Sequence, residues 1–118
     1  MACGGAIGAL CRFGLQHWLG AIYSGRFPLA IFLANSIGSF CLGLLYVLII
    51  EKGLIPDIWR PLLIIGLLGA FTTFSTFSLD SILLIEQGEW FMALVNVFSN
   101  VCVGLIAAVI GMYIGRWL

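Results

Sequence analysis

The stretch GAFTTFSTF, residues 69–77, interleaves hydroxyl side chains with aromatic rings inside an apolar run from about 59 to 85. Its polar and aromatic members are Thr72, Thr73, Ser75, Thr76, Phe71, Phe74 and Phe77. Glycines 66 and 69, followed by a Ser/Thr run, weaken helical order. A broken helix at membrane depth is tolerated only where it is buried in protein or lines a cavity. We therefore predict a membrane helix that is interrupted in this stretch.

An interrupted helix frees backbone groups for ions: carbonyls suit a cation, whereas N–H and O–H donors suit an anion. A phenyl ring offers a weakly positive edge to an anion and a negative face to a cation. Weak binding at several sites is what conduction requires. We expect Ser78 to cap the restarted helix, with Asp80 in its first turn. The alternative is a Ser/Thr-rich kink with packed rings and no ion.

The composition is that of an integral membrane protein. Of 118 residues, 63% are hydrophobic and 8% are charged, against about 45–50% and about 25% in ordinary globular chains. Basic and acidic residues balance at five each, so the chain carries no basic surface for nucleic acid. No linker or low-complexity tract divides it, which predicts one transmembrane domain over residues 1–118. The N-terminal segment lacks the basic region of a cleaved signal peptide.

Four stretches have the roughly 20 apolar residues that a membrane-spanning helix needs. They cover about residues 2–22, 29–50, 59–85 and 90–116. Trp18, Trp59, Trp90 and Trp117 lie near their ends, as in an aromatic belt. Because the connections are short, neighbouring helices are expected to run antiparallel, with both termini on one side of the membrane.

Loop charges orient the chain only weakly. The side with the termini carries Lys52, Arg60 and Arg116, the other side carries Arg26, and Arg12 lies inside the first span. Under the positive-inside rule this bias allows one orientation with the termini inside, or a chain that inserts both ways. Arg12 either extends toward an interface or holds an anion near a vestibule.

Amide side chains align on two of the expected spans. Asn35, Ser39 and Gly43 share a helical face, as do Asn96, Asn100 and Gly104. Polar groups in hydrocarbon mark packing contacts or function. Each asparagine could instead make an interhelical hydrogen bond that helps assembly.

No motif of an enzyme or a resident metal is present. The sequence has no HExxH, no phosphate-binding loop and no paired carboxylates. His17 stands alone, and we interpret it as an interfacial or packing residue. Cys3, Cys11, Cys41 and Cys102 show no metal spacing, so we expect small buried hydrophobes.

Three motifs together resemble the Fluc (CrcB) family of fluoride channels: GGAIGALCRF (4–13), NSIGSFCLG (35–43) and GLLGAFTTFSTFS (66–78). The resemblance implies an antiparallel, dual-topology homodimer with two fluoride pores in a bacterial inner membrane. It also implies passive export of fluoride down its electrochemical gradient, which confers fluoride resistance.

The resemblance also implies roles for individual residues. Asn35 corresponds to the pore asparagine, Phe74 and Phe77 to the paired rings, Ser75 and Thr76 to adjacent hydroxyl donors, and Arg12 to an arginine near the pore mouth. Asn96 and Asn100 extend the polar track. The carbonyls of Gly69 and Thr72 correspond to ligands of a structural Na⁺ at the dimer centre. Many relatives have threonine at the position of Ile31.

Three other functions are alternatives to a channel. A proton-coupled multidrug exporter needs a carboxylate in the first span, and that span has none. A non-transporting membrane subunit would need no broken helix and should tolerate Asn35→Ala or Phe77→Ile. A fluoride/proton antiporter would have Asp80 as its only plausible intramembrane carrier.

Overall fold

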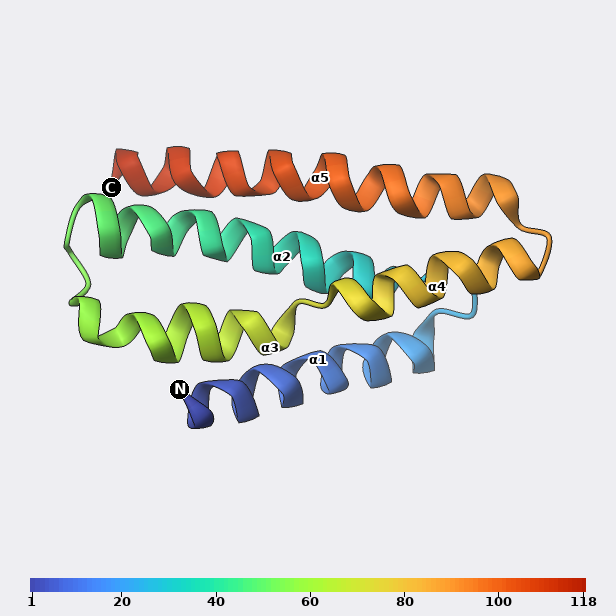
Figure 1. Ribbon diagram of the computed structural model, residues 1–118, viewed down its shortest axis with the longest axis horizontal. Coiled ribbons are helices and arrows are strands. Elements are labelled where there is room, and N and C mark those ends of the chain that lie inside the picture. Colours follow the sequence, from blue (N-terminus) through green and yellow to red (C-terminus); the bar gives the residue numbers. More distant parts are fainter.

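The computed structural model describes all residues, 1–118, as a helical bundle of 48 × 27 × 23 Å without strands. Its elements are α1 (Ala2–Ile22), α2 (Leu29–Tyr46), η1 (Val47–Glu51), η2 (Asp57–Trp59), η3 (Pro61–Leu68), α3 (Gly69–Phe71), α4 (Phe74–Glu86) and α5 (Trp90–Trp117). Figure 1 shows the rods side by side, with both termini toward the same end of the long axis. The all-helical prediction is confirmed.

Three helical stretches are long and apolar enough to cross a membrane: Leu29–Glu51, Asp57–Glu86 and Trp90–Trp117. Each of the first two joins several elements, because α2 continues into the π-helix η1, and η2, η3, α3 and α4 follow one another. The 21-residue α1 is not among these candidates. It carries Arg12, Gln16 and His17, which lower its hydropathy.

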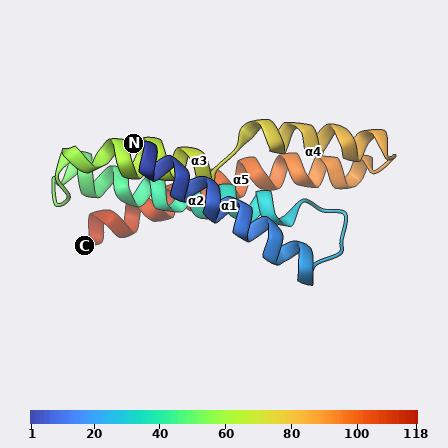
Figure 2. The same ribbon diagram turned by 90° about the horizontal axis from the view of Figure 1, so that it is seen from below.

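The expected interruption of the third stretch is present at two residues. Thr72 (φ −84°, ψ 156°) and Thr73 (φ −153°, ψ 122°) are extended between α3 and α4. The break separates two packing environments: η3 and α3 lie against α1 and α2, whereas α4 lies against α5 (Figure 2). The hydroxyl-rich stretch is therefore the point at which the helix leaves one neighbour for another.

Close backbone contacts hold the long helices together. A Cβ at Gly111 of α5 would overlap the Phe40 carbonyl of α2, and one at Gly8 of α1 would overlap the Leu67 carbonyl of η3. Such approach is typical of small-residue interfaces between membrane helices. These glycines therefore serve packing within one chain.

The prediction that the cysteines are buried is wrong for three of the four. Cys3, Cys11 and Cys102 are exposed on the single chain, and Cys41 is half-buried. In a chain that spans a membrane, outward faces are apolar because lipid or another subunit covers them, so a small apolar side chain is at home there.

Candidate functional site

The helix break is held open by Asn35 of α2. Its Oδ1 accepts a hydrogen bond from the Thr73 N–H at 2.8 Å, and its Nδ2 donates to the Thr73 carbonyl at 3.1 Å. A side-chain amide can pair with a backbone amide in this way because it carries one donor and one acceptor side by side. Asn35 therefore satisfies both backbone groups of Thr73, the second residue of the break.

Thr73 caps α4. Its Oγ1 accepts from the Thr76 N–H at 3.2 Å, the bond expected of an N-cap threonine. The prediction that Ser78 caps the restarted helix is wrong: the Ser78 hydroxyl donates to the Phe74 carbonyl at 3.0 Å, inside α4. Asp80 consequently lies beyond the first turn, which contains no acidic residue. The helix restarts earlier because Thr73 combines an extended backbone with a hydroxyl that accepts from the Thr76 N–H.

The four carbonyls of residues 69–72 lose their helical donors at the break, and Gly69 and Thr72 are the first and last of them. In a continuous helix the N–H groups of Thr73 and Thr76 would bond the carbonyls of Gly69 and Thr72, four residues earlier. Here those N–H groups bond Asn35 Oδ1 and Thr73 Oγ1 instead. Gly69 and Thr72 therefore present hard oxygen atoms of the kind that alkali cations prefer, and the sodium site expected there stays a prediction.

Arg12 lies beside one of these carbonyls, that of Thr72. Its Nη1 is 3.5 Å from the Thr72 oxygen, a long contact for a hydrogen bond. The structure thus places the guanidinium of α1 at the break.

A chain of amides connects α2, α5 and α4. Asn35 Nδ2 donates to Asn100 Oδ1 at 3.3 Å, and Asn100 Nδ2 donates to Asn96 Oδ1 at 2.9 Å. Asn96 Nδ2 donates to Ser81 Oγ at 2.9 Å, and Ser81 Oγ donates to the Phe77 carbonyl at 2.9 Å. Asn96 is 1% exposed, so the chain of bonds satisfies amides that would otherwise be costly to bury.

The predicted polar track contained Asn35, Asn96 and Asn100 but not Ser81. Ser81 is buried and ends the amide chain on α4. The signal that could have found it is its position one helical turn after Phe77. Thr73 was predicted as part of the hydroxyl run, but not as the helix cap.

The two phenylalanines differ in environment. The Phe74 and Phe77 rings lie 5.6 Å apart between centroids, at 52°. Phe77 is 8% exposed, whereas Phe74 is 77% exposed on the single chain. The Phe74 ring therefore faces outward at the level of the break.

Hydroxyl donors gather at the same point. The Thr73 hydroxyl donates to Thr76 Oγ1 at 3.2 Å and lies 3.3 Å from Ser75 Oγ. The Thr76 hydroxyl accepts that bond, so its own proton is free to donate. The first-turn N–H groups of Phe74 and Ser75 have no acceptor within α4. The start of α4 thus offers several donors and the positive end of a helix dipole.

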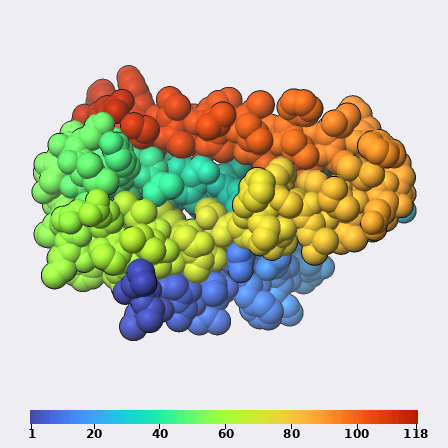
Figure 3. Space-filling view, viewed as in Figure 1, coloured from blue at the N-terminus to red at the C-terminus, as the bar shows by residue number.

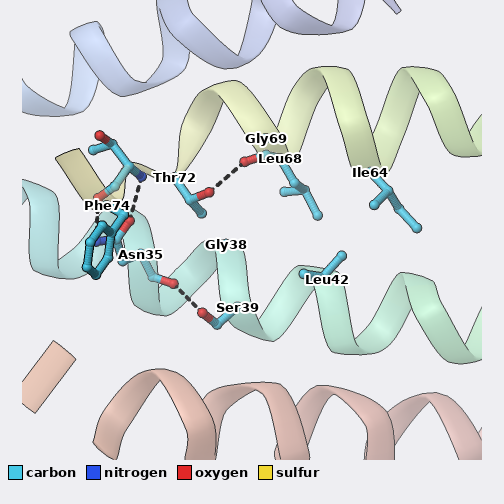
Figure 4. A pocket seen from close by; sticks show the side chains of 10 residues that line it. Asn35, Gly38, Ser39, Leu42, Ile64, Leu68, Gly69, Thr72 and Phe74 are labelled. Carbon is cyan, nitrogen blue, oxygen red and sulfur yellow. Dashed lines mark hydrogen bonds between the residues drawn. The ribbon is translucent and has the colours of Figure 1, made fainter. Parts of the chain in front are cut away.

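Open space lies on one side of Asn35. A central recess of about 300 Å³ runs between α2 and the η3–α3 segment (Figure 4), where the surface is hollowed near the middle of the molecule (Figure 3). Asn35 and Phe74 lie at one end of it, and Leu42 and Ile64 at the other.

A second hollow, the loop-end recess, lies nearer the connection between α1 and α2. It consists of two adjoining pockets of about 250 and 140 Å³ that share Pro28 and Asp80. Ile31, one turn before Asn35, lines it. Asn35 and Phe74 therefore lie on the central recess, and the loop-end recess reaches α2 one helical turn away, at Ile31.

Known proteins provide an independent comparison. A family model described as CrcB-like protein, Camphor Resistance (CrcB), matches residues 1–112. The fluoride-specific ion channel FluC of Magnetococcus marinus is 42% identical over 116 residues, covering 98% of this chain and 94% of the relative. Fluoride-specific ion channel FluC 2 of Symbiobacterium thermophilum is 42% identical over 118 residues, covering 99% and 96%. Fluoride-specific ion channel FluC of Saccharophagus degradans is 43% identical over 111 residues, covering 93% and 82%. The chain belongs to the CrcB-like family.

Proposed function

We propose that this protein is a fluoride-selective ion channel that exports fluoride passively down its electrochemical gradient and so confers fluoride resistance. The single observation that carries the proposal is the donor-rich layer at the helix break, formed by Asn35, Phe74 and Phe77 with the start of α4, which borders the central recess and lies one turn of α2 from the loop-end recess. The relatives named as fluoride-specific channels support it.

Fluoride is small and strongly hydrated, so a pore must replace its water shell. The Thr76 hydroxyl, the Ser75 hydroxyl, the start of α4 and the ring edges of Phe74 and Phe77 can donate in that layer. None of them carries a full charge, so binding stays weak enough for release. Both Asn35 donors are engaged by Thr73 and Asn100, so Asn35 acts chiefly by holding these donors in place. Asn100 and Asn96 continue the polar track across α5.

The full channel is proposed to be an antiparallel, dual-topology homodimer of single-domain subunits in the bacterial inner membrane, with α1 as a fourth span. Two features favour a second copy. Phe74 is exposed at the level of the break, and few residues of the single chain are buried. The weak charge asymmetry of the loops is compatible with insertion in both directions.

A structural Na⁺ is proposed at the contact between subunits. The Gly69 and Thr72 carbonyls would hold it, and a second copy would supply an equal pair, because two oxygens are too few for an alkali cation. The ion would add positive charge beside the break. Light scattering of the purified protein in sodium or choline buffer tests both ideas: we expect two copies per particle in sodium and fewer in choline. One copy in both buffers would exclude the dimer, and two copies in both would exclude the need for sodium.

Efflux from liposomes tests the function directly. Purified protein should release fluoride rapidly and chloride negligibly, without a pH gradient, and Phe77→Ile should reduce fluoride release by more than about tenfold because a buried ring of the layer is lost. Empty liposomes provide the baseline. Folded wild-type protein that releases no fluoride would overturn the proposal, and fluoride release that requires a pH gradient would indicate an antiporter instead.

A further inference from the structure

An ion pair joins the two connections at the end of the molecule opposite the termini. Arg26 Nη1 lies 2.5 Å from Glu89 Oε1, and the two side chains are 63% and 34% exposed. Arg26 belongs to the connection between α1 and α2, and Glu89 directly precedes α5. Both groups therefore lie outside the helices, at the water-facing end.

Arg26 also lines the loop-end recess, together with Asp80 and Pro28. It is the only Lys or Arg side chain that lines either recess. The adjoining pocket continues from Pro28 to Ile31, one turn before Asn35. A path along this recess thus begins at a guanidinium and ends at the layer of the helix break.

The charges along this path act in opposite directions on an anion. Asp80 lies on the recess and repels fluoride that approaches Asn35. Arg26 attracts it, but Glu89 engages the guanidinium. An ion pair exposed to water is weak, so an arriving anion can compete with the Glu89 carboxylate for Arg26.

We propose that Arg26 is the residue that first binds fluoride at the loop-end mouth, and that Glu89 restrains it. This inference rests on the proposed fluoride channel. The strength of the bond between Arg26 and Glu89 then sets how often an anion enters the recess. Arg26 is accordingly a determinant of the rate of fluoride entry at low fluoride concentration.

Two substitutions separate this role from a structural one. Arg26→Gln and Glu89→Gln both break the ion pair, so a purely structural bond predicts that both change fluoride flux in the same direction. If Arg26 instead binds incoming fluoride and Glu89 restrains it, the two substitutions should change fluoride flux in opposite directions. At low ionic strength we expect Arg26→Gln to lower the initial rate of fluoride efflux about two- to fivefold and Glu89→Gln to raise it by a similar factor.

Salt and a charge-preserving variant sharpen the test. At about 1 M of an impermeant salt the Debye length falls to about 3 Å, so the differences between variants should disappear. Arg26→Lys should keep a rate near that of wild type. Arg60→Gln is the matched control, because Arg60 pairs with Asp57 at 3.4 Å and lines neither recess; its rate should not change.

The outcomes are distinguishable. Wild-type protein without fluoride flux would overturn the proposed function. Normal wild-type flux with equal or same-direction effects of Arg26→Gln and Glu89→Gln would overturn only the role of Arg26. If Arg26→Gln fails to fold, as judged by its particle size, Glu89→Gln alone decides: an unchanged or lower rate refutes recruitment.

Discussion

The two faces of α2 contrast sharply. Toward α5, α2 meets backbone with backbone: a Cβ at Gly43 would overlap the Ala108 carbonyl, and one at Gly111 would overlap the Phe40 carbonyl. Toward the helix break, α2 presents Asn35 and a recess of about 300 Å³. The same helix therefore packs closely against α5 on one face and supports an open polar site on the other.

The contrast teaches how a small membrane protein can keep a broken helix. Without a hydrophobic drive between helices in lipid, close contact along glycines provides the packing. The rigid α2–α5 pair then holds Asn35 and Asn100 at fixed positions, where Asn35 donates to Asn100 and pairs with the backbone of Thr73. The polar face can stay partly open because the other face carries the packing.

The largest expected effect comes from disrupting the close packing between α2 and α5. Gly111→Ala places a methyl group on the Phe40 carbonyl, and we expect a loss of about 3 kcal/mol in the free energy of unfolding, measured in detergent. Gly104→Ala is the control on the same helix, because its Cβ would meet only Ser39 Oγ at 3.6 Å. Equal stability of the two variants would show that close packing of α5 on α2 at Gly111 does not stabilise the fold.

A strong effect on flux is expected at the open face. Asn35→Ala leaves the Thr73 N–H and carbonyl without their partner, which costs about 1–3 kcal/mol. We expect fluoride efflux to fall about 10- to 100-fold. Ser36→Ala is the neighbouring control, because the Ser36 hydroxyl has no hydrogen-bond partner. If Asn35→Ala conducts like Ser36→Ala, the amide does not hold the site.

The smallest expected effect concerns one hydroxyl. Thr76→Val keeps the side-chain shape but removes the free donor beside Thr73, and one hydrogen bond is worth about 0.5–1.5 kcal/mol. Fluoride efflux should fall about two- to tenfold in the liposome assay. Ser78→Ala removes a hydroxyl that is bonded to the Phe74 carbonyl and should change efflux less. If Ser78→Ala lowers fluoride efflux more than Thr76→Val does, the Thr76 hydroxyl is not the donor to fluoride.

Much of the fold was predictable because it depends on local composition. Apolar runs of spanning length, bounded by SGRFP, EKGLIPD and EQGE, correspond to the helices and turns observed. The break was predictable as well, since hydroxyl residues compete with the helical backbone. The N-cap of α4 was predicted wrongly as Ser78, because serine and threonine are both suitable cap residues. Thr73 is the cap because its bonds to Asn35 hold its backbone extended.

The hydrogen-bond partners of the polar side chains could not be predicted from the sequence. The alignment of Asn96 with Asn100 followed from helical spacing, but their bonds to Ser81 and Asn35 join residues 15 and 65 positions apart. Likewise, nothing local pairs Arg26 with Glu89, 63 positions away.

By itself, the sequence determined a membrane chain of apolar helices with one interruption, because helix length and helix breaking depend on neighbouring residues. The tertiary structure alone decided where the interruption begins, which carbonyls it frees, and which recess Asn35 lines. The physical reason is that a backbone group released from its own helix takes the nearest partner in space, and α2 and α5 supply that partner only after they have packed.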